Sequence, residues 1–242
     1  HFVAADVMNI NLTKNMTNQI YNALVARSDE EKKIVLPRFF KTGKGQYGEG
    51  DKFLGVTVPN IRDVAKEFSS VSFNVIEELI HSPWHEMRMC ALLILVNNSK
   101  KEVTKDTFDF YLSQTEHINN WDLVDLSAPQ IVGQFLLNKE RDILYRLAES
   151  DLLWDNRIAI VSTLTFIRNN DLNDTYKLSL KMMNHKHDLM HKAIGWMLRE
   201  AGKRDAKRLY DFVMENKSIM PRTMLRYSIE KFDSKTRKEL LK

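Results

Sequence analysis

A short pattern recurs along the chain at intervals close to 35 residues. A basic residue is followed three positions later by a small or apolar residue, at Arg88, at Arg157 and again at Lys192. The intervals are 69 and 35 residues, which is two periods and then one. Repeats of this length are typical of two-helix units that stack on their neighbours, because one unit cannot bury its apolar face alone. The spacing therefore predicts a helical solenoid close to the HEAT type.

The remainder of the sequence also favours helices. Glycine (8) and proline (5) are scarce among 242 residues, and no segment alternates apolar and polar residues for long enough to predict a strand. We predict an all-α protein, with one HEAT-like solenoid domain over residues 1–242 whose equivalent helices line one concave surface. The predicted helices span residues 6–27, 28–40, 57–69, 72–81, 84–98, 103–116, 121–138, 140–150, 154–169, 172–184, 187–202, 204–216 and 220–232.

One glycine-rich segment interrupts this pattern. Residues 41–55 hold five of the eight glycines, and residues 43–48 match the GxGxxG pattern of dinucleotide-binding proteins. That pattern requires a preceding strand and a following helix within a βαβ unit, whereas here a predicted helix precedes it and more loop follows. We interpret the segment as a surface loop whose backbone N–H groups suit a phosphate.

Several classes of protein and site are excluded by composition. The single cysteine, Cys90, lies in an apolar run and rules out an internal disulfide or a cysteine-rich zinc site. His187 and His191 are four residues apart, but Asp188 stands after His187 where the zinc-peptidase pattern has a glutamate base, so no metal and no cofactor are predicted. No apolar run reaches the ~18 residues that span a membrane. No basic segment marks a secretory signal near the first residue, so a cytoplasmic location is expected.

Positive charge is concentrated in the last quarter of the chain. Residues 184–242 contain 15 lysines and arginines against 8 acidic residues, a local balance of +7, while the whole chain carries +4. Such a distribution favours a polyanionic partner, although a lysine-rich solvated helix surface is the commoner reason for it.

The segment from Asn119 to Asp125 carries the most informative side chains. Trp121 and Asp125 are four residues apart, which places both on one face of a helix, and Asn120 is a suitable N-cap. Stacked repeats would bring this face beside Arg157 and Trp196 on neighbouring helices. Two aromatic faces with a carboxylate suit a cationic ligand.

Each of these residues also has a purely structural explanation. Tryptophans at helical spacing are most often core residues, and Asp125 alone would most often be a solvated helix acid. A repeat arginine such as Arg157 commonly forms an ion pair, for which Asp125, Asp151 and Asp155 are candidates. Only the shared position of the four residues in the repeat favours a functional site.

At these residues the chain resembles the AlkD-type DNA alkylation repair glycosylases. The matching segments are residues 48–56 with Pro59 and Arg62, residues 120–125, residues 154–157 and residues 192–200. They occur in order from about residue 40 to 230. The resemblance implies a HEAT-like solenoid, curved around a concave DNA-binding groove, that holds duplex DNA. It also implies hydrolysis of the N-glycosidic bond of cationic N3- and N7-alkylpurines without metal or cofactor, and with it a nucleoid-associated location in the cytoplasm.

The resemblance also implies roles for individual residues. Asp125, Trp121, Arg157 and Trp196 take the catalytic positions, and the lesion is captured in an open groove without extrusion of the nucleotide. The candidate DNA contacts are Arg199, Arg62, Lys52 and Lys203. We expect a monomer that binds duplex DNA containing alkylated purines, with no membrane and no obligate protein partner.

The expected chemistry agrees with these residue types. An alkylated purine is already a cationic leaving group, so the enzyme has to stabilise an oxocarbenium-like sugar and orient a water molecule, for which one carboxylate is sufficient. The alternative is a non-catalytic helical-repeat protein that binds bent or branched DNA or a protein partner, since most helical solenoids are scaffolds. Such a protein would tolerate the loss of Asp125.

Overall fold

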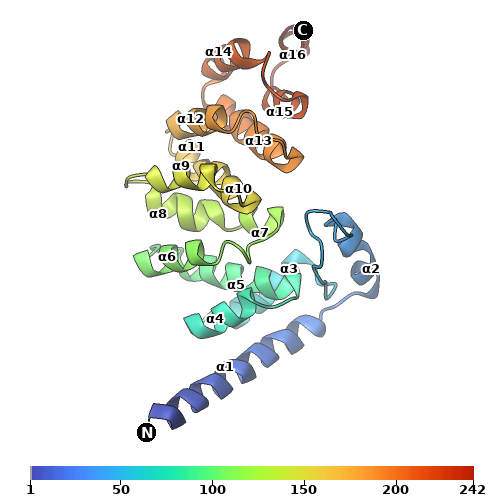
Figure 1. The fold of residues 1–242 in the computed structure, drawn as a ribbon, viewed down its shortest axis with the longest axis vertical. Helices are drawn as coiled ribbons and strands as arrows, with labels where there is room; N and C mark the ends of the chain where they lie inside the picture. Colours follow the sequence, from blue (N-terminus) through green and yellow to red (C-terminus); the bar gives the residue numbers. More distant parts are fainter. Residues whose placement is uncertain (1) are drawn as a thin grey trace. The chain divides into compact units, whose positions relative to one another are not determined.

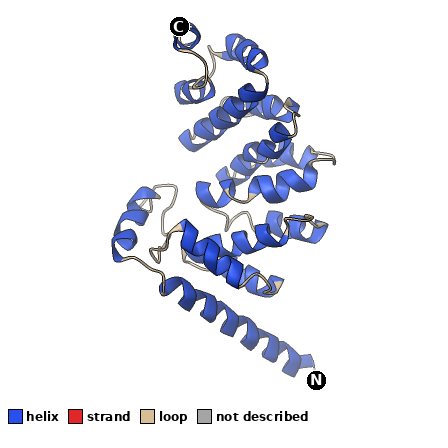
Figure 2. Ribbon diagram, turned by 180° about the vertical axis from the view of Figure 1, so that it is seen from behind, coloured by secondary structure: helices blue, strands red, loops and turns tan. Residues whose placement is uncertain are grey.

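The computed structural model describes residues 2–242. In that range the regular secondary-structure elements are all helices (Figures 1 and 2). A single bridge between Lys52 and Trp84 is the sole strand-like pairing found there. The all-α, helical-repeat prediction is therefore confirmed. Among residues 2–242, no helix is both long enough and apolar enough to cross a membrane.

Packing divides the chain into two compact units, His1–Ser127 and Ala128–Lys242. The single solenoid domain and its curved groove involve both units, and they stay predictions. The first unit contains α1 (Phe2–Val25), α2 (Glu30–Phe39), α3 (Val58–Glu67), α4 (Phe73–Ile80), α5 (His85–Asn98), α6 (Lys105–Ser113) and α7 (Trp121–Asp125).

The second unit begins with a short π-helix and continues with α-helices of up to 17 residues. Its elements are the π-helix η1 (Pro129–Gly133), α8 (Gln134–Leu136), α9 (Asp142–Glu149), α10 (Leu153–Val161), α11 (Thr163–Arg168), α12 (Asn173–Lys181), α13 (Asp188–Arg204), α14 (Ala206–Asn216), α15 (Arg222–Ser228) and α16 (Ser234–Leu240). Helix α16 lies beyond the last helix that the sequence pattern predicted.

Helix α5 forms the centre of the first unit. Every residue from His85 to Leu95 is buried, and α1, α3, α4 and α7 all pack against this helix. In the second unit α13 has the corresponding place, because α10, α11, α12, α14 and α15 contact it. These two helices carry two of the positions that define the sequence repeat, Arg88 and Lys192.

Polar contacts within each unit reflect the repeat period. His81 bonds to Gln114 in the first unit, and Asn156 bonds to His185 in the second, at separations of 33 and 29 residues. Arg208 likewise donates to Asn173, 35 residues away. Bonds between residues 29–35 positions apart agree with the packing of each helix pair on the next one along the chain.

The predicted helix over residues 121–138 is wrong as one continuous element. Helix α7 ends at Asp125, a turn follows, and a π-helix begins at Pro129. Proline has no N–H, so residue 129 cannot donate to the carbonyl of Asp125 four residues earlier. The hydroxyl of Ser127 donates to the Leu123 carbonyl at 2.6 Å and completes the turn.

Candidate active site

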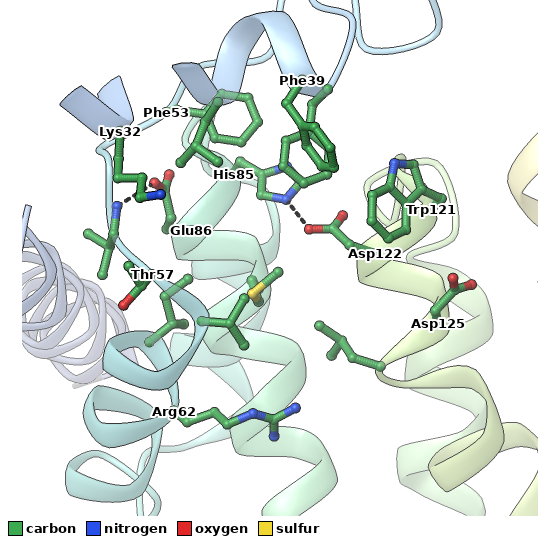
Figure 3. Close-up of a pocket in the computed structure, with 17 residues that line it drawn as sticks. Lys32, Phe39, Phe53, Thr57, Arg62, His85, Glu86, Trp121, Asp122 and Asp125 are labelled. Atoms are coloured by element: carbon green, nitrogen blue, oxygen red, sulfur yellow. Dashed lines mark hydrogen bonds and ion pairs between the residues drawn. The ribbon is translucent and has the colours of Figure 1, made fainter. Parts of the chain in front are cut away.

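Helix α7 presents Trp121 and Asp125 to a cavity of about 560 Å³ in the first unit (Figure 3). The buried Asn120 side chain accepts the Trp121 N–H at 2.8 Å and caps the helix, as the sequence predicts. Leu123 and Val124 are fully buried on the other side of α7. Because this side is anchored in the core, the side of α7 with Trp121 and Asp125 faces the cavity, where both residues are half-buried.

One side of the cavity is a wall of aromatic rings. Phe40 stacks on Trp121 with ring centroids 5.5 Å apart, and Phe53 stacks on the Phe40 ring at 5.2 Å. Phe39 meets Trp121 edge-on at 6.1 Å. We call Phe39, Phe40, Phe53 and Trp121 the aromatic wall. Such rings attract a cation through their negative π-faces, so the wall suits a flat, positively charged ligand.

Asp125 supplies a carboxylate at the same cavity. Tyr111 is fully buried close to it, and its hydroxyl pairs with Ser127 at 2.8 Å. Burial raises the pKa of Tyr111, and the negative charge of Asp125 raises it further. Tyr111 therefore stays neutral beside Asp125, and leaves the carboxylate as the negative group at this end of the cavity.

A group of four charged side chains lies against the aromatic wall, and two of them, His85 and Asp122, also line the cavity. The two ring nitrogens of His85 face two carboxylates, with Nδ1 at 2.8 Å from Asp51 and Nε2 at 2.7 Å from Asp122. Arg88 donates to the same Asp51 oxygen at 2.9 Å. We call Asp51, His85, Arg88 and Asp122 the charge cluster. With two carboxylates and two cations it is neutral overall, which lowers the cost of burying it.

The protonation states follow from these contacts. Burial alone lowers the pKa of His85, but the hydrogen bonds and charges of Asp122 and Asp51 outweigh burial and raise it to about 9. Burial raises the pKa of Asp51, and His85 and Arg88 together outweigh that and hold it below its usual value. His85 is therefore an imidazolium at neutral pH.

Glu86 fixes the loop that carries Phe53. Its carboxylate accepts the backbone N–H groups of Leu54, Gly55 and Val56 at 2.8, 2.8 and 3.0 Å. The side chain is 1% exposed, so these bonds satisfy a buried charge. Gly55 has a φ of 82°, which favours glycine, and an added Cβ would lie 2.5 Å from the Asp29 carbonyl oxygen.

The predicted DNA contacts of the first unit lie on its surface. Arg62 is exposed and lines the same cavity as Trp121 and Asp125, and Lys32 lines it from α2. Lys52 is exposed with its ammonium group 6.0 Å from the centre of the Trp84 ring. Of the predicted contacts in this unit, the structure thus brings Arg62 to the site, while Lys52 is turned to Trp84.

The second unit carries the remaining predicted site residues. Arg157 on α10 is buried and donates to the Leu189 carbonyl of α13 at 2.8 Å. Trp196 is half-buried on α13, and Arg199, one turn later, pairs with Glu230 and lies over the Tyr227 ring. Lys203 is exposed and pairs with Glu200 at 2.9 Å. Their meeting with Trp121 and Asp125 in one groove stays a prediction.

The histidines of the second unit make hydrogen bonds to the protein itself. His185 pairs with Asn156 at 3.0 Å, and a ring nitrogen of His191 bonds to the His185 carbonyl oxygen. His187 accepts the Leu189 N–H at the start of α13. Residues 2–242 contain no group of three or more side chains suited to a metal ion.

Sequence reasoning missed the charge cluster and three rings of the aromatic wall. Two signals pointed to the cluster. His85 and Arg88 are charged residues at the start of an apolar run, and His85 precedes Asp122 by 37 residues, close to the repeat period. The other rings of the wall are Phe39 at the end of α2 and Phe40 and Phe53 after it. They reach the cavity because of the path that the chain takes between α2 and α3, and the sequence contains no periodic signal for that path.

These features define the class, an all-α helical-repeat protein with a tryptophan and a carboxylate at an aromatic cavity. The family model for DNA alkylation repair enzymes matches residues 20–232. The chain belongs to this family, and membership implies a role in DNA repair with DNA as the substrate.

One solved structure shows the same fold. It is described as a predicted DNA alkylation repair enzyme from Enterococcus faecalis, with a TM-score of 0.69 and 14% sequence identity. The match covers 86% of this chain and 98% of the other. No curated protein matches the chain significantly.

Proposed function

We propose that the protein is a monofunctional DNA glycosylase that hydrolyses the N-glycosidic bond of N3- and N7-alkylated purines in duplex DNA, as a first step of base excision repair. The observation that carries the proposal is the position of Asp125 one turn after Trp121, at a cavity lined by aromatic rings, in a chain of this family. Arg157 and Trp196 complete the proposed set, as the family resemblance implies.

The reaction needs little from the protein beyond charge and position. The alkylated base carries a positive charge, so it leaves as a neutral purine when its bond to C1′ breaks. The bonding electrons go to the base, and the sugar becomes an oxocarbenium-like cation. Asp125 stabilises this cation and accepts a proton from the water molecule that attacks C1′. The face of Trp121 stabilises the cationic base before the bond breaks.

The resemblance suggests an open groove without a deep pocket, in which the lesion is captured without extrusion of the nucleotide. The cavity that would form part of this groove has a volume of about 560 Å³ and is lined by residues of the first unit. A lesion at Asp125 would therefore have the aromatic wall on one side. Basic residues of both units, with Arg62 in the first and Arg199 and Lys203 in the second, are the proposed phosphate contacts.

The test is release of 7-methylguanine from duplex DNA by the wild-type protein and by the Asp125→Asn variant. The substitution keeps the shape of the side chain and removes its charge, so we expect loss of base release by roughly a hundredfold or more with little change in DNA affinity. Asp109→Asn is the matched control, since Asp109 is an exposed acid of the same unit paired only with Lys105.

Two outcomes would contradict the proposal. Full activity of the Asp125→Asn variant would remove Asp125 from the mechanism. Absence of release by the wild-type protein, together with DNA binding that weakens steeply as salt is raised, would favour the non-catalytic DNA-binding alternative. Fractionation of cells that contain the protein would test the proposed cytoplasmic, nucleoid-associated location.

A further inference from the structure

The charge cluster has no part in the reaction as derived, although it contacts the aromatic wall and reaches the cavity through His85 and Asp122. His85 connects two segments far apart in sequence, because its nitrogens reach Asp51 in the loop and Asp122 in α7. Asp122 is the neighbour of Trp121 and lies three residues before Asp125. A contact that holds Asp122 therefore holds the first turn of the helix on which both proposed catalytic residues are placed.

The geometry requires a particular form of the ring. A neutral imidazole has one N–H and one lone pair, so it can donate to only one carboxylate. Both nitrogens of His85 lie within 2.8 Å of carboxylate oxygens, which are acceptors only. Both nitrogens must then carry a proton. Loss of one proton would turn a hydrogen bond into a contact between two lone pairs.

Aromatic contacts transmit the position of the ring to the wall. Phe53 stacks on His85 with centroids 4.6 Å apart, and Phe40 lies 4.9 Å from it on the way to Trp121. A protonated imidazole is a cation against these faces and is held more strongly than a neutral ring. His85 thus contacts the aromatic wall through Phe40 and Phe53, and it contacts α7 through Asp122.

We propose that His85, as an imidazolium that bridges Asp51 and Asp122, is a positioning residue. It holds α7 and the aromatic wall in the relative position that base release requires. This inference rests on the proposed function. His85 lines the cavity, and its proposed part is to hold other residues in place, with no bond to the reacting atoms. Its raised pKa of about 9 keeps the bridge closed at neutral pH and opens it in alkali.

Other charged groups face the ring or line the same cavity. They come from every element packed around the cavity, and some also line it. They are Asp51 in the loop, Asp122 and Asp125 in the α7 helix, Lys32 in α2, Arg62 in α3, and Glu86 and Arg88 in α5 itself. Asp122 has the largest raising effect on His85, so its removal is the most direct way to shift the titration.

The experiment measures single-turnover release of 7-methylguanine between about pH 6 and pH 10, with substrate incubated alone at each pH as a blank. The wild-type rate should be level to about pH 8 and fall above about pH 9. In Asp122→Asn the fall should move to lower pH by roughly one unit or more. His85→Gln should be slower by roughly tenfold at all pH values without the alkaline fall, at unchanged DNA affinity.

His81→Gln is the matched control, because His81 is an exposed histidine of the same unit that pairs with Gln114 outside the cavity. It should behave as the wild type. An alkaline fall at the same pH in wild type and Asp122→Asn would overturn the positioning role, as would a wild-type rate in His85→Gln.

A second measurement does not depend on catalysis. The His85 imidazole and the Trp121 indole N–H can be followed by NMR through the same pH range in the wild type and in Asp122→Asn. We expect the Trp121 signal to move with the His85 titration in both proteins, at lower pH in the variant. If neither the wild type nor the variant releases base but the two signals move together, the proposed function is wrong, and the positioning of Trp121 by the His85 bridge is still supported. If Trp121 does not respond to the titration of His85, the bridge does not position it.

Discussion

Gly195 lies directly against Tyr227, so closely that a Cβ added to Gly195 would stand 2.5 Å from the Tyr227 Cβ and 2.9 Å from the Met224 carbonyl oxygen. Helices α13 and α15 approach at this point, and Trp196 is the next residue on α13. Backbone and Cβ atoms cannot rotate away, so the close approach depends on the glycine.

We predict that Gly195→Ala destabilises the second unit and weakens base release by displacing Trp196. Overpacking of this kind costs roughly 1–3 kcal/mol. Gly202→Ala is the control on the same helix, since its added methyl meets chiefly the Leu209 Cδ2, the end of a flexible side chain. Both variants gain the same helix propensity. Equal unfolding free energies for the two variants, measured in urea, would contradict the predicted clash.

Glu86→Gln should loosen the loop that carries Phe53. Three backbone N–H groups donate to the Glu86 carboxylate, and an amide replaces one acceptor oxygen by a donor. We expect a loss of roughly 2–4 kcal/mol, because buried donors lose a charged partner. Hydrogen exchange at Leu54, Gly55 and Val56 should become faster.

The control for this variant is Glu77→Gln, an exposed glutamate on α4 in the same unit. It should leave the free energy of unfolding within about 0.5 kcal/mol of the wild type. Unchanged exchange rates at Leu54 to Val56 in Glu86→Gln would show that the loop is held by other contacts.

The helical repeat was predictable because it rests on periodicity. Trp121 and Asp125 share a face through the 3.6-residue turn, and the 35-residue interval relates Arg157 to Lys192. The bridge between Asp51 and His85 was not predictable in this way, since it depends on the path of residues 41–55 through space. Helix α7 ends at Asp125 because Pro129 cannot donate to the carbonyl four residues earlier. The sequence contains this signal, but the apolar pattern that continues past Pro129 favours one long helix.

Lys203→Ala should weaken DNA binding equally for methylated and unmodified duplexes. Lys203 is exposed in the basic last quarter of the chain and pairs with Glu200 of the same helix at 2.9 Å, an exposed ion pair that contributes little. A phosphate contact releases counterions, so the slope of log Kd against log salt should fall by about 0.9 for one lost contact. Lys105→Ala, an exposed lysine paired with Asp109, is the control. An unchanged slope in Lys203→Ala would exclude Lys203 from the interface.

Stability should decline on both sides of neutrality through the charge cluster. The pKa of His85 is raised from 6.5 to about 9, so its contribution is complete below pH 6.5 and is lost as pH rises through about 9. The pKa of Asp51 is lowered below 3.8, so its contribution is complete above that value and is lost in stronger acid. The His85 contribution is on the order of 3 kcal/mol. Urea unfolding of wild type and His85→Gln at pH 6, 8 and 10 checks this, because the difference between the two proteins should shrink at pH 10. A constant difference would mean that the His85 charge does not stabilise the fold.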